Sequence, residues 1–373
     1  MGTPIRHASI SNIDFLRGIA AIVVLVWHYQ HFFYPQAAVG LKDRSIQPFF
    51  TNLRWLYEYG SHGVQFFWIL SGFVFFHAYQ GRQDVSFREF AVTRFSRLYP
   101  LHLATLLLVA VLQFVSFRIL GHYQIYPFND LYHFLLNLFM ISHWGLQKGW
   151  SFNAPIWSVS VEIIIYGLFF AYVKSTRITL LTATAWFILS WVAFQGISST
   201  NAFSQCALLF ILGGAVHQLH IYIGRLLPSL VCALLSSSLL ALVIYALYLK
   251  GEWSQSWVYF GIFPASIWMC ASFEQVGVSF GKAGHVVGNL TYASYLIHIP
   301  IQIAVMTAMD TANLDRISIV QSPSFFVVFL ITVCLSSYWI FQNIELPLKQ
   351  FIRQRLLRSR ISTAFQPPQA PAG

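Results

Sequence analysis

The chain has 373 residues, of which 57% are hydrophobic and only 9% are charged, and its mean hydropathy is +0.62. A water-soluble protein needs more charged residues than this to cover its surface, so the composition excludes a soluble enzyme or binding module. Lys and Arg number 22 against 12 Asp and Glu, and in a membrane protein such an excess indicates cytoplasmic loops rather than nucleic-acid binding.

Ten apolar runs are long enough to cross a bilayer as helices, so the sequence predicts an all-α integral membrane protein. The runs cover residues 12–34, 62–80, 98–118, 155–173, 178–196, 203–220, 228–249, 255–272, 289–309 and 323–344. An eleventh run, 131–142, is too short to cross and is predicted to be re-entrant or interfacial. With ten crossings and a cytoplasmic N-terminus, the inner segments hold about twice as many basic residues as the outer segments, as the positive-inside rule requires.

The predicted organisation is one membrane domain, 11–347, followed by a basic cytoplasmic tail, 348–373, whose Pro-rich end is disordered. The expected location is a plasma membrane, of the bacterial inner-membrane type, with both termini cytoplasmic. The four cysteines lie in apolar runs without metal-ligand spacing. His217 and His220 have no further ligand nearby in the sequence, so no metal site is predicted.

The first apolar run contains Asp14, Arg17 and His28. Eleven residues at about 100° per residue come within roughly 20° of three full turns, so Arg17 and His28 share one helix face, about 16 Å apart. Ionisable groups within membrane spans are rare and usually functional. An Arg and a His at this spacing can link a ligand bound on the cytoplasmic side to a reaction inside the membrane. The alternative is that Asp14 pairs with Arg17 while His28 bonds to a neighbouring helix.

Two further groups of residues suggest a site. Arg94 and Arg97 are three residues apart, so both guanidinium groups can bind phosphate oxygens, although they can also be ordinary positive-inside anchors. Ser158 and Glu162 share a helix face beside Trp157, and the ten-span topology places Glu162 in the outer half of the bilayer, where it could meet and orient His28. The alternative for Glu162 is a bond to a neighbouring helix.

These strings resemble the membrane-bound acyltransferase 3 family, whose members move acyl groups from acyl-CoA onto sugars. The matching strings are Arg-x₁₀-His from Arg17, Gly-Val-x-Phe-Phe and Ser-Gly-Phe within 63–76, Arg-x-x-Arg-x-x-Pro from Arg94, Trp-Ser-x-x-x-Glu from Trp157, and Tyr-x-x-Tyr-Leu-x-His-x-Pro from Tyr292 to Pro300. Gln65 stands where many members carry Asp.

The resemblance implies that acyl-CoA binds with its phosphates near Arg94, Arg97 and Arg17. It also implies that His28 acts as general base, oriented by Glu162, on a carbohydrate hydroxyl of a surface polysaccharide or lipid-linked glycan. A covalent acyl-histidine route stays open. Acetyl is the default acyl group and succinyl an alternative, with no permanently bound cofactor. Six further residues are predicted to line the acceptor site or a pore: Asp14, Ser71, Trp157, Ser158, Tyr295 and His298.

A different class of function also fits a multi-pass protein with buried charges. A transporter of a small solute or glycan would use such groups for substrate or proton movement. Its expected signature, paired Gly- or Pro-broken helices in two related halves, is not visible in the sequence. A purely structural membrane protein ranks third, because it gives no reason for an Arg and a His on one face.

Overall fold

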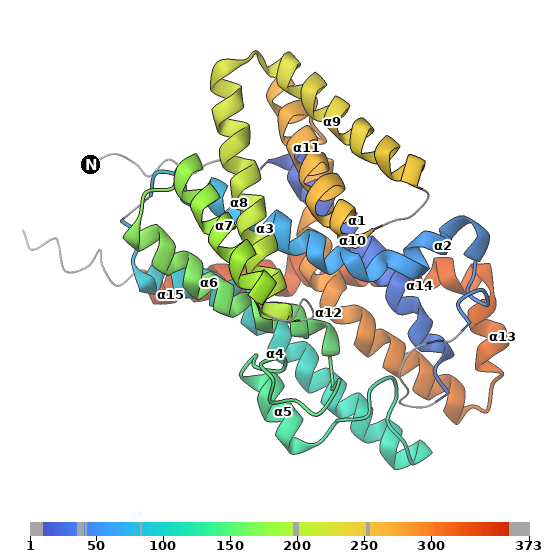
Figure 1. Ribbon diagram of the computed structural model, residues 1–373. Helices are drawn as coiled ribbons and strands as arrows, with labels where there is room; N and C mark the ends of the chain where they lie inside the picture. The colour runs from blue at the N-terminus through green and yellow to red at the C-terminus, as the bar shows by residue number, and fades with distance from the viewer. Residues whose placement is uncertain are drawn as a thin grey trace, which may run out of the picture.

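The computed structural model describes residues 10–35, 41, 43–82, 84–196, 201–250 and 254–357. Throughout these ranges the regular structure is helical and no strand occurs (Figure 1). The predicted all-α class is therefore confirmed. The disordered end predicted for the tail falls outside the described residues beyond Leu357.

Within these described ranges, eight continuous helical segments are long and apolar enough to cross a membrane. They are α1 with η1 (Ser11–His28, Tyr29–Phe33), α4 (Phe87–Leu120), η3 with α6 (Ala154–Ile156, Trp157–Ser175), α8 (Ala202–Leu226), α9 (Ser229–Lys250), α10 with η4 and α11 (Gln255–Trp257, Val258–Ile262, Phe263–Val276), α12 (Gly281–Thr311), and α14 with η5 and α15 (Pro323–Ile340, Phe341–Glu345, Leu346–Leu357). The other two predicted spans are α3 (Gly63–Tyr79) and α7 (Leu180–Gly196), each of 17 residues. Short helices α2 (Phe50–Tyr59), η2 (Gly60–His62) and α13 (Arg316–Gln321) connect them.

Three helices extend well beyond the predicted spans. The run predicted to begin at residue 98 begins at Phe87, because the Ser86 hydroxyl accepts the Glu89 backbone N–H at 3.1 Å and caps the helix there. Pro100 lies inside this helix and does not end it. Likewise α12 begins at Gly281 and α15 continues to Leu357, packed along α4. These additional turns carry seven basic residues, so we call this the basic end of the bundle. They are Arg88, Arg94, Arg97, Lys282, Lys349, Arg353 and Arg355.

The segment 131–142 contains one short helix, α5 (Leu131–Leu138). Asp130 caps it by accepting the His133 backbone N–H at 2.8 Å. Its far end is held to α4 by the His102 ring, whose Nε2 lies 2.8 Å from the Asn137 carbonyl oxygen. At about 1.5 Å per residue, a helix of this length covers about 12 Å and cannot cross a bilayer. The prediction that this segment is not a span is confirmed.

Glycines allow two helix pairs to approach backbone to backbone. On α3, a Cβ at Gly72 would lie 1.7 Å from the Phe210 carbonyl oxygen of α8, and a Cβ at Gly213 would lie 1.9 Å from the Ile69 carbonyl oxygen. Gly288 of α12 meets the Asp14 backbone of α1 in the same way. Small residues let membrane helices pack closely where lipid offers no hydrophobic drive for association. The close α1–α12 pair carries much of the site described next.

Candidate functional site

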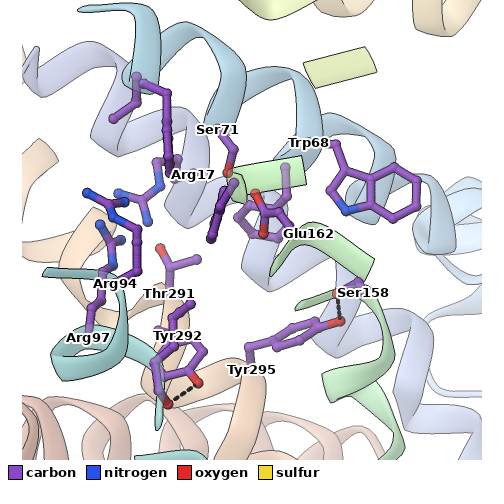
Figure 2. A pocket seen from close by; sticks show the side chains of 15 residues that line it. Arg17, Trp68, Ser71, Arg94, Arg97, Ser158, Glu162, Thr291, Tyr292 and Tyr295 are labelled. Carbon is purple, nitrogen blue, oxygen red and sulfur yellow. Dashed lines mark hydrogen bonds between the residues drawn. The ribbon is translucent and has the colours of Figure 1, made fainter. Parts of the chain in front are cut away.

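A cavity lies between α1, α3, α4, α6 and α12 (Figure 2). Its polar lining consists of Arg17, Ser71, Arg94, Arg97, Ser158, Glu162, Tyr166, Thr291, Tyr292 and Tyr295, and its apolar lining of Phe67, Trp68, Val74, Phe75 and Leu98. The cavity has a volume of about 100 Å³. Seven of these residues were predicted from separate motifs, and the tertiary structure brings them to one place. They are Arg17, Ser71, Arg94, Arg97, Ser158, Glu162 and Tyr295.

Three guanidinium groups meet at one end of the cavity (Figure 2). Arg17 pairs with Asp14 at 3.4 Å, and the other Asp14 oxygen lies 2.9 Å from His285 Nδ1. Arg94 lies with its Cζ 4.4 Å from the centre of the Phe75 ring, and its buried Nε has no hydrogen-bond partner. Among the described residues neither Arg94 nor Arg97 forms an ion pair. This end can therefore accept an anion.

Two residues beside the arginines were not predicted as site residues. The π-helix η5 turns Glu345 inward, where its carboxylate interacts with Arg97 and Lys349. Lys349 also faces Arg94 and Arg97 from α15. The only sequence signal for this arrangement is the position of Glu345 at the end of an apolar run, which places it near the basic end without indicating its neighbours.

Glu162 lies on α6 and is 9% exposed. Its carboxylate faces the hydroxyls of Ser71 and Tyr166 and the guanidinium groups of Arg97 and Arg17. One carboxylate oxygen is buried without a hydrogen-bond partner. The predicted contact with His28 is not found among the described residues: the α6 register directs Glu162 toward the arginines, whereas His28 faces α12. The described contacts therefore place Glu162 with the arginines and do not bring it to His28.

At the end away from the arginines, the cavity is bounded by Ser158 of α6 and Tyr295 of α12, whose hydroxyl groups are hydrogen-bonded to each other. The Ser158 and Tyr295 hydroxyl oxygens are 2.8 Å apart (Figure 2). The Tyr295 hydroxyl also donates to the Pro155 carbonyl oxygen at 2.6 Å. Ser71 also lines the cavity. Asp14, Trp157 and His298, predicted to line the same site, are not among the lining residues.

His28 lies beyond this boundary, in a second group of polar residues formed by His28, His31 and His298, which we call the histidine centre. Its ring centre is 4.8 Å from that of His298 and 5.0 Å from that of His31. Its Nδ1 lies 3.0 Å from the Val24 carbonyl oxygen, and it is 7% exposed. The His298 ring lies 6.3 Å from the Tyr295 ring, so His298 stands between the cavity boundary and His28. The two centres are neighbours along α1 and α12, but His28 does not open directly into the cavity.

Gln302 connects two members of the histidine centre and was not predicted. Its side-chain amide nitrogen donates to the His28 carbonyl oxygen at 2.9 Å, and its amide oxygen lies 3.1 Å from His31 Nδ1. The Tyr126 hydroxyl approaches the other ring nitrogen of His31 at 3.4 Å. The spacing of His28 and His31 by three residues could have indicated a shared helix face. Nothing in the sequence pointed to Gln302 or Tyr126.

Aromatic side chains lead from the cavity to the loop after α5. Trp68, which lines the cavity, packs against Trp157 with ring centres 5.7 Å apart. Trp157 in turn contacts His143 at 5.0 Å and Trp150 at 6.0 Å, and His143 stacks on Trp150 with an interplanar angle of 10°. Burial lowers the pKa of His143, so this ring is neutral at pH 7. Trp150 is 41% exposed and offers an aromatic surface.

Comparison with known proteins bears on what this arrangement does. The model of the family described as "Acyltransferase domain", acyltransferase 3, matches residues 10–342. The acyltransferase MdmB of Streptomyces mycarofaciens is 30% identical over 167 residues, which cover 44% of this chain and 39% of the relative. No solved structure shows significant similarity. Because the family match covers nearly the whole described bundle, and that bundle contains helices long and apolar enough to cross a membrane, the chain belongs to the acyltransferase 3 family of multi-pass membrane proteins.

Proposed function

We propose that the protein transfers an acyl group, with acetyl the first choice, from acyl-CoA to a carbohydrate hydroxyl, and that His28 is the general base. The observation that supports this most is the convergence of Arg17, Arg94 and Arg97 on one membrane-embedded cavity, next to a buried histidine centre. Family membership supports acyl transfer, and the chemistry of the cavity suggests the donor.

The donor is recognised by its phosphates. CoA carries a pyrophosphate and a 3′-phosphate, and guanidinium groups bind phosphate oxygens in a fork geometry. By the positive-inside rule the basic end of the bundle faces the cytoplasm, where acyl-CoA is made. A cavity of about 100 Å³ is smaller than the roughly 300 Å³ of ordinary ligand pockets. The nucleotide would therefore stay at the arginine end, and only the acyl-thioester end would pass inward.

The acceptor is a sugar hydroxyl. Such a hydroxyl has a pKa far above neutrality and needs a base, and a neutral imidazole is suited to this. The exposed Trp150 ring and the Trp157–Trp68 pair support a carbohydrate, because flat aromatic faces can pack against the apolar face of a sugar ring. Glu162, which faces the arginines, would fix the positions of their guanidinium groups.

Thiol release from acetyl-CoA by the purified protein tests this proposal. We expect release that depends on an added glycan acceptor, together with a mass increase of one acetyl group on that glycan. Absence of thiol release with any polysaccharide or lipid-linked acceptor, combined with solute uptake by reconstituted vesicles, would favour the transporter alternative instead.

Replacing Arg94 by Gln tests the donor site. We expect the KM for acetyl-CoA to rise by about 10- to 100-fold, because a hydrogen bond to a charged group contributes about 1.5–3 kcal/mol. The loss should be smaller with 3′-dephospho-acetyl-CoA if Arg94 binds the 3′-phosphate. Arg118→Gln, the same substitution at the exposed other end of α4, is the matched control and should leave the KM unchanged. Equal KM values for wild type and Arg94→Gln would place the phosphates elsewhere.

A further inference from the structure

The hydrogen bonds of the histidine centre define which ring nitrogen of each histidine carries the proton. His28 Nδ1 lies 3.0 Å from the Val24 carbonyl oxygen, and His298 Nδ1 lies 2.9 Å from the Ser294 carbonyl oxygen. A carbonyl oxygen only accepts, so each Nδ1 must be the N–H donor. In the neutral ring, Nε2 is then an acceptor with a free lone pair. Both histidines are thus held in the same tautomer by their own helices.

His31 is held in this tautomer as well. Gln302 donates its amide N–H to the His28 carbonyl oxygen, which turns its amide oxygen toward His31 Nδ1. His31 Nδ1 must then donate, and His31 Nε2 accepts from the Tyr126 hydroxyl at 3.4 Å. His31 therefore has a partner at each nitrogen, whereas His28 and His298 each have one only at Nδ1.

The Nε2 atoms of His28 and His298 have no protein donor. His298 Nε2 is buried without a hydrogen-bond partner, and none is found for His28 Nε2 among the described residues. A buried acceptor left unpaired is costly, so such an atom often marks a place where a ligand or a proton enters. The ring centres are 4.8 Å apart. Two rings joined by one N–H···N bond of about 2.9 Å would have centres about 5 Å apart. No hydrogen bond joins the two rings among the described residues, but at this spacing they can share a proton once one Nε2 is protonated and the rings turn toward each other.

We propose that His298 is a second base in the reaction, and that it shares with His28 the proton removed from the acceptor hydroxyl. This inference rests on the proposed acyl transfer. In the step, the acceptor O–H bond breaks and its proton goes to His28 Nε2, while the acceptor oxygen forms a bond to the thioester carbonyl carbon. The C–S bond then breaks and the departing thiolate takes the proton, which gives free CoA. While the proton is on the histidines, the His298 lone pair stabilises the His28 imidazolium through an N–H···N bond.

His298 is also the histidine nearer to the donor. Its ring lies 6.3 Å from that of Tyr295, which lines the cavity, whereas the aromatic neighbours of His28 are Trp27, His31 and His298. A proton shared between the two rings is therefore delivered toward the side from which the thioester sulfur enters. His28 is placed to receive a proton, and His298 is placed to return it.

The test uses the purified full-length protein with acetyl-CoA and a glycan acceptor that the wild type acetylates. His298→Gln puts an amide near Nε2 that cannot take a proton at neutral pH. We expect kcat to fall about 100-fold, within the usual range for an acid–base group, while the KM for acetyl-CoA changes less than about 3-fold. The double variant His28→Gln/His298→Gln should be no slower than His28→Gln, because residues that act as a unit give non-additive losses.

Two further variants keep the result interpretable. His298→Asn retains a side-chain amide near Nδ1 and removes only the Nε2 position. If His298→Gln does not fold, His298→Asn therefore shows whether the Nε2 atom is needed for transfer. His102→Gln replaces another fully buried histidine and should leave kcat unchanged. A wild-type protein that releases no thiol would overturn the acyl transfer itself. An active wild type with an inactive His28→Gln, but with normal kcat in both His298 variants or with losses that multiply in the double variant, would overturn only the second base.

Discussion

Replacement of His28 by Ala should lower kcat for acyl transfer by about 10²- to 10⁴-fold, the range that a positioned general base contributes. The expected loss is the largest that we predict for a single residue. His28 Nε2 has no protein donor, its Nδ1 is fixed by the Val24 carbonyl oxygen, and the ring is buried. No other histidine in the centre has the same position on α1. Thiol release and the mass of the glycan product measure the effect directly.

The KM for acetyl-CoA distinguishes a lost base from a lost donor site. Because the arginines lie in the cavity and His28 lies beyond its boundary, the KM in His28→Ala should stay within about 3-fold of wild type. His102→Gln serves again as the control for replacing a buried histidine. Transfer in His28→Ala at more than about a third of the wild-type rate would remove His28 from the mechanism.

Gly72→Ala should strongly destabilise the protein. An added Cβ would lie 1.7 Å from the Phe210 carbonyl oxygen and 2.6 Å from its carbonyl carbon. These are backbone atoms of α8, so the clash cannot be relieved by rotating a side chain, and α3 and α8 must separate. Overpacking commonly costs about 1–3 kcal/mol, and contact with backbone places this site at or above the upper end. We expect a lower unfolding temperature in detergent and poor recovery of folded protein.

The chain provides a matched control for this substitution. Gly167 on α6 is exposed, and a Cβ there meets no atom within 4 Å. Gly167→Ala should therefore keep or slightly raise the unfolding temperature, because Ala is favoured over Gly within a helix by about 1 kcal/mol. Gly213→Ala, on the opposite side of the same interface, should behave like Gly72→Ala. Equal unfolding temperatures for Gly72→Ala and Gly167→Ala would show that the α3–α8 contact is not tight in solution.

The sequence predicted the helices better than their ends. A bilayer requires about 20 apolar residues for each span, so long apolar runs are readable without any knowledge of neighbours. The start of α4 at Phe87 was missed, although the Ser86–Glu89 capping pair is a local signal that identifies it. The prolongation of α12 and α15 had no such signal, because polar helical turns outside the membrane depend on the helices against which they pack.

The site was also predicted only in part, because local patterns give the face of a helix but not its neighbours. Arg17 and His28 were placed on one face from helix geometry alone, and a single unbroken α1 carries both. Among the described residues Glu162 does not contact His28 as predicted, because the depth of a residue in the membrane does not specify the direction in which it points. His31, Gln302 and Tyr126 were missed since their roles arise from contacts between segments distant in sequence.

Thus the sequence by itself determined that this protein is an all-helical membrane protein, which residues interrupt its apolar runs, and which family its motifs resemble. These properties depend on local composition, the thickness of the bilayer and the helical repeat. Only the tertiary structure decided that Glu162 lies with the arginines and that His28 lies with His298 and Gln302. Helices that are apolar on nearly all sides carry little information about their rotation, so the close glycine contacts between helices, rather than hydrophobic pattern, select which polar groups meet.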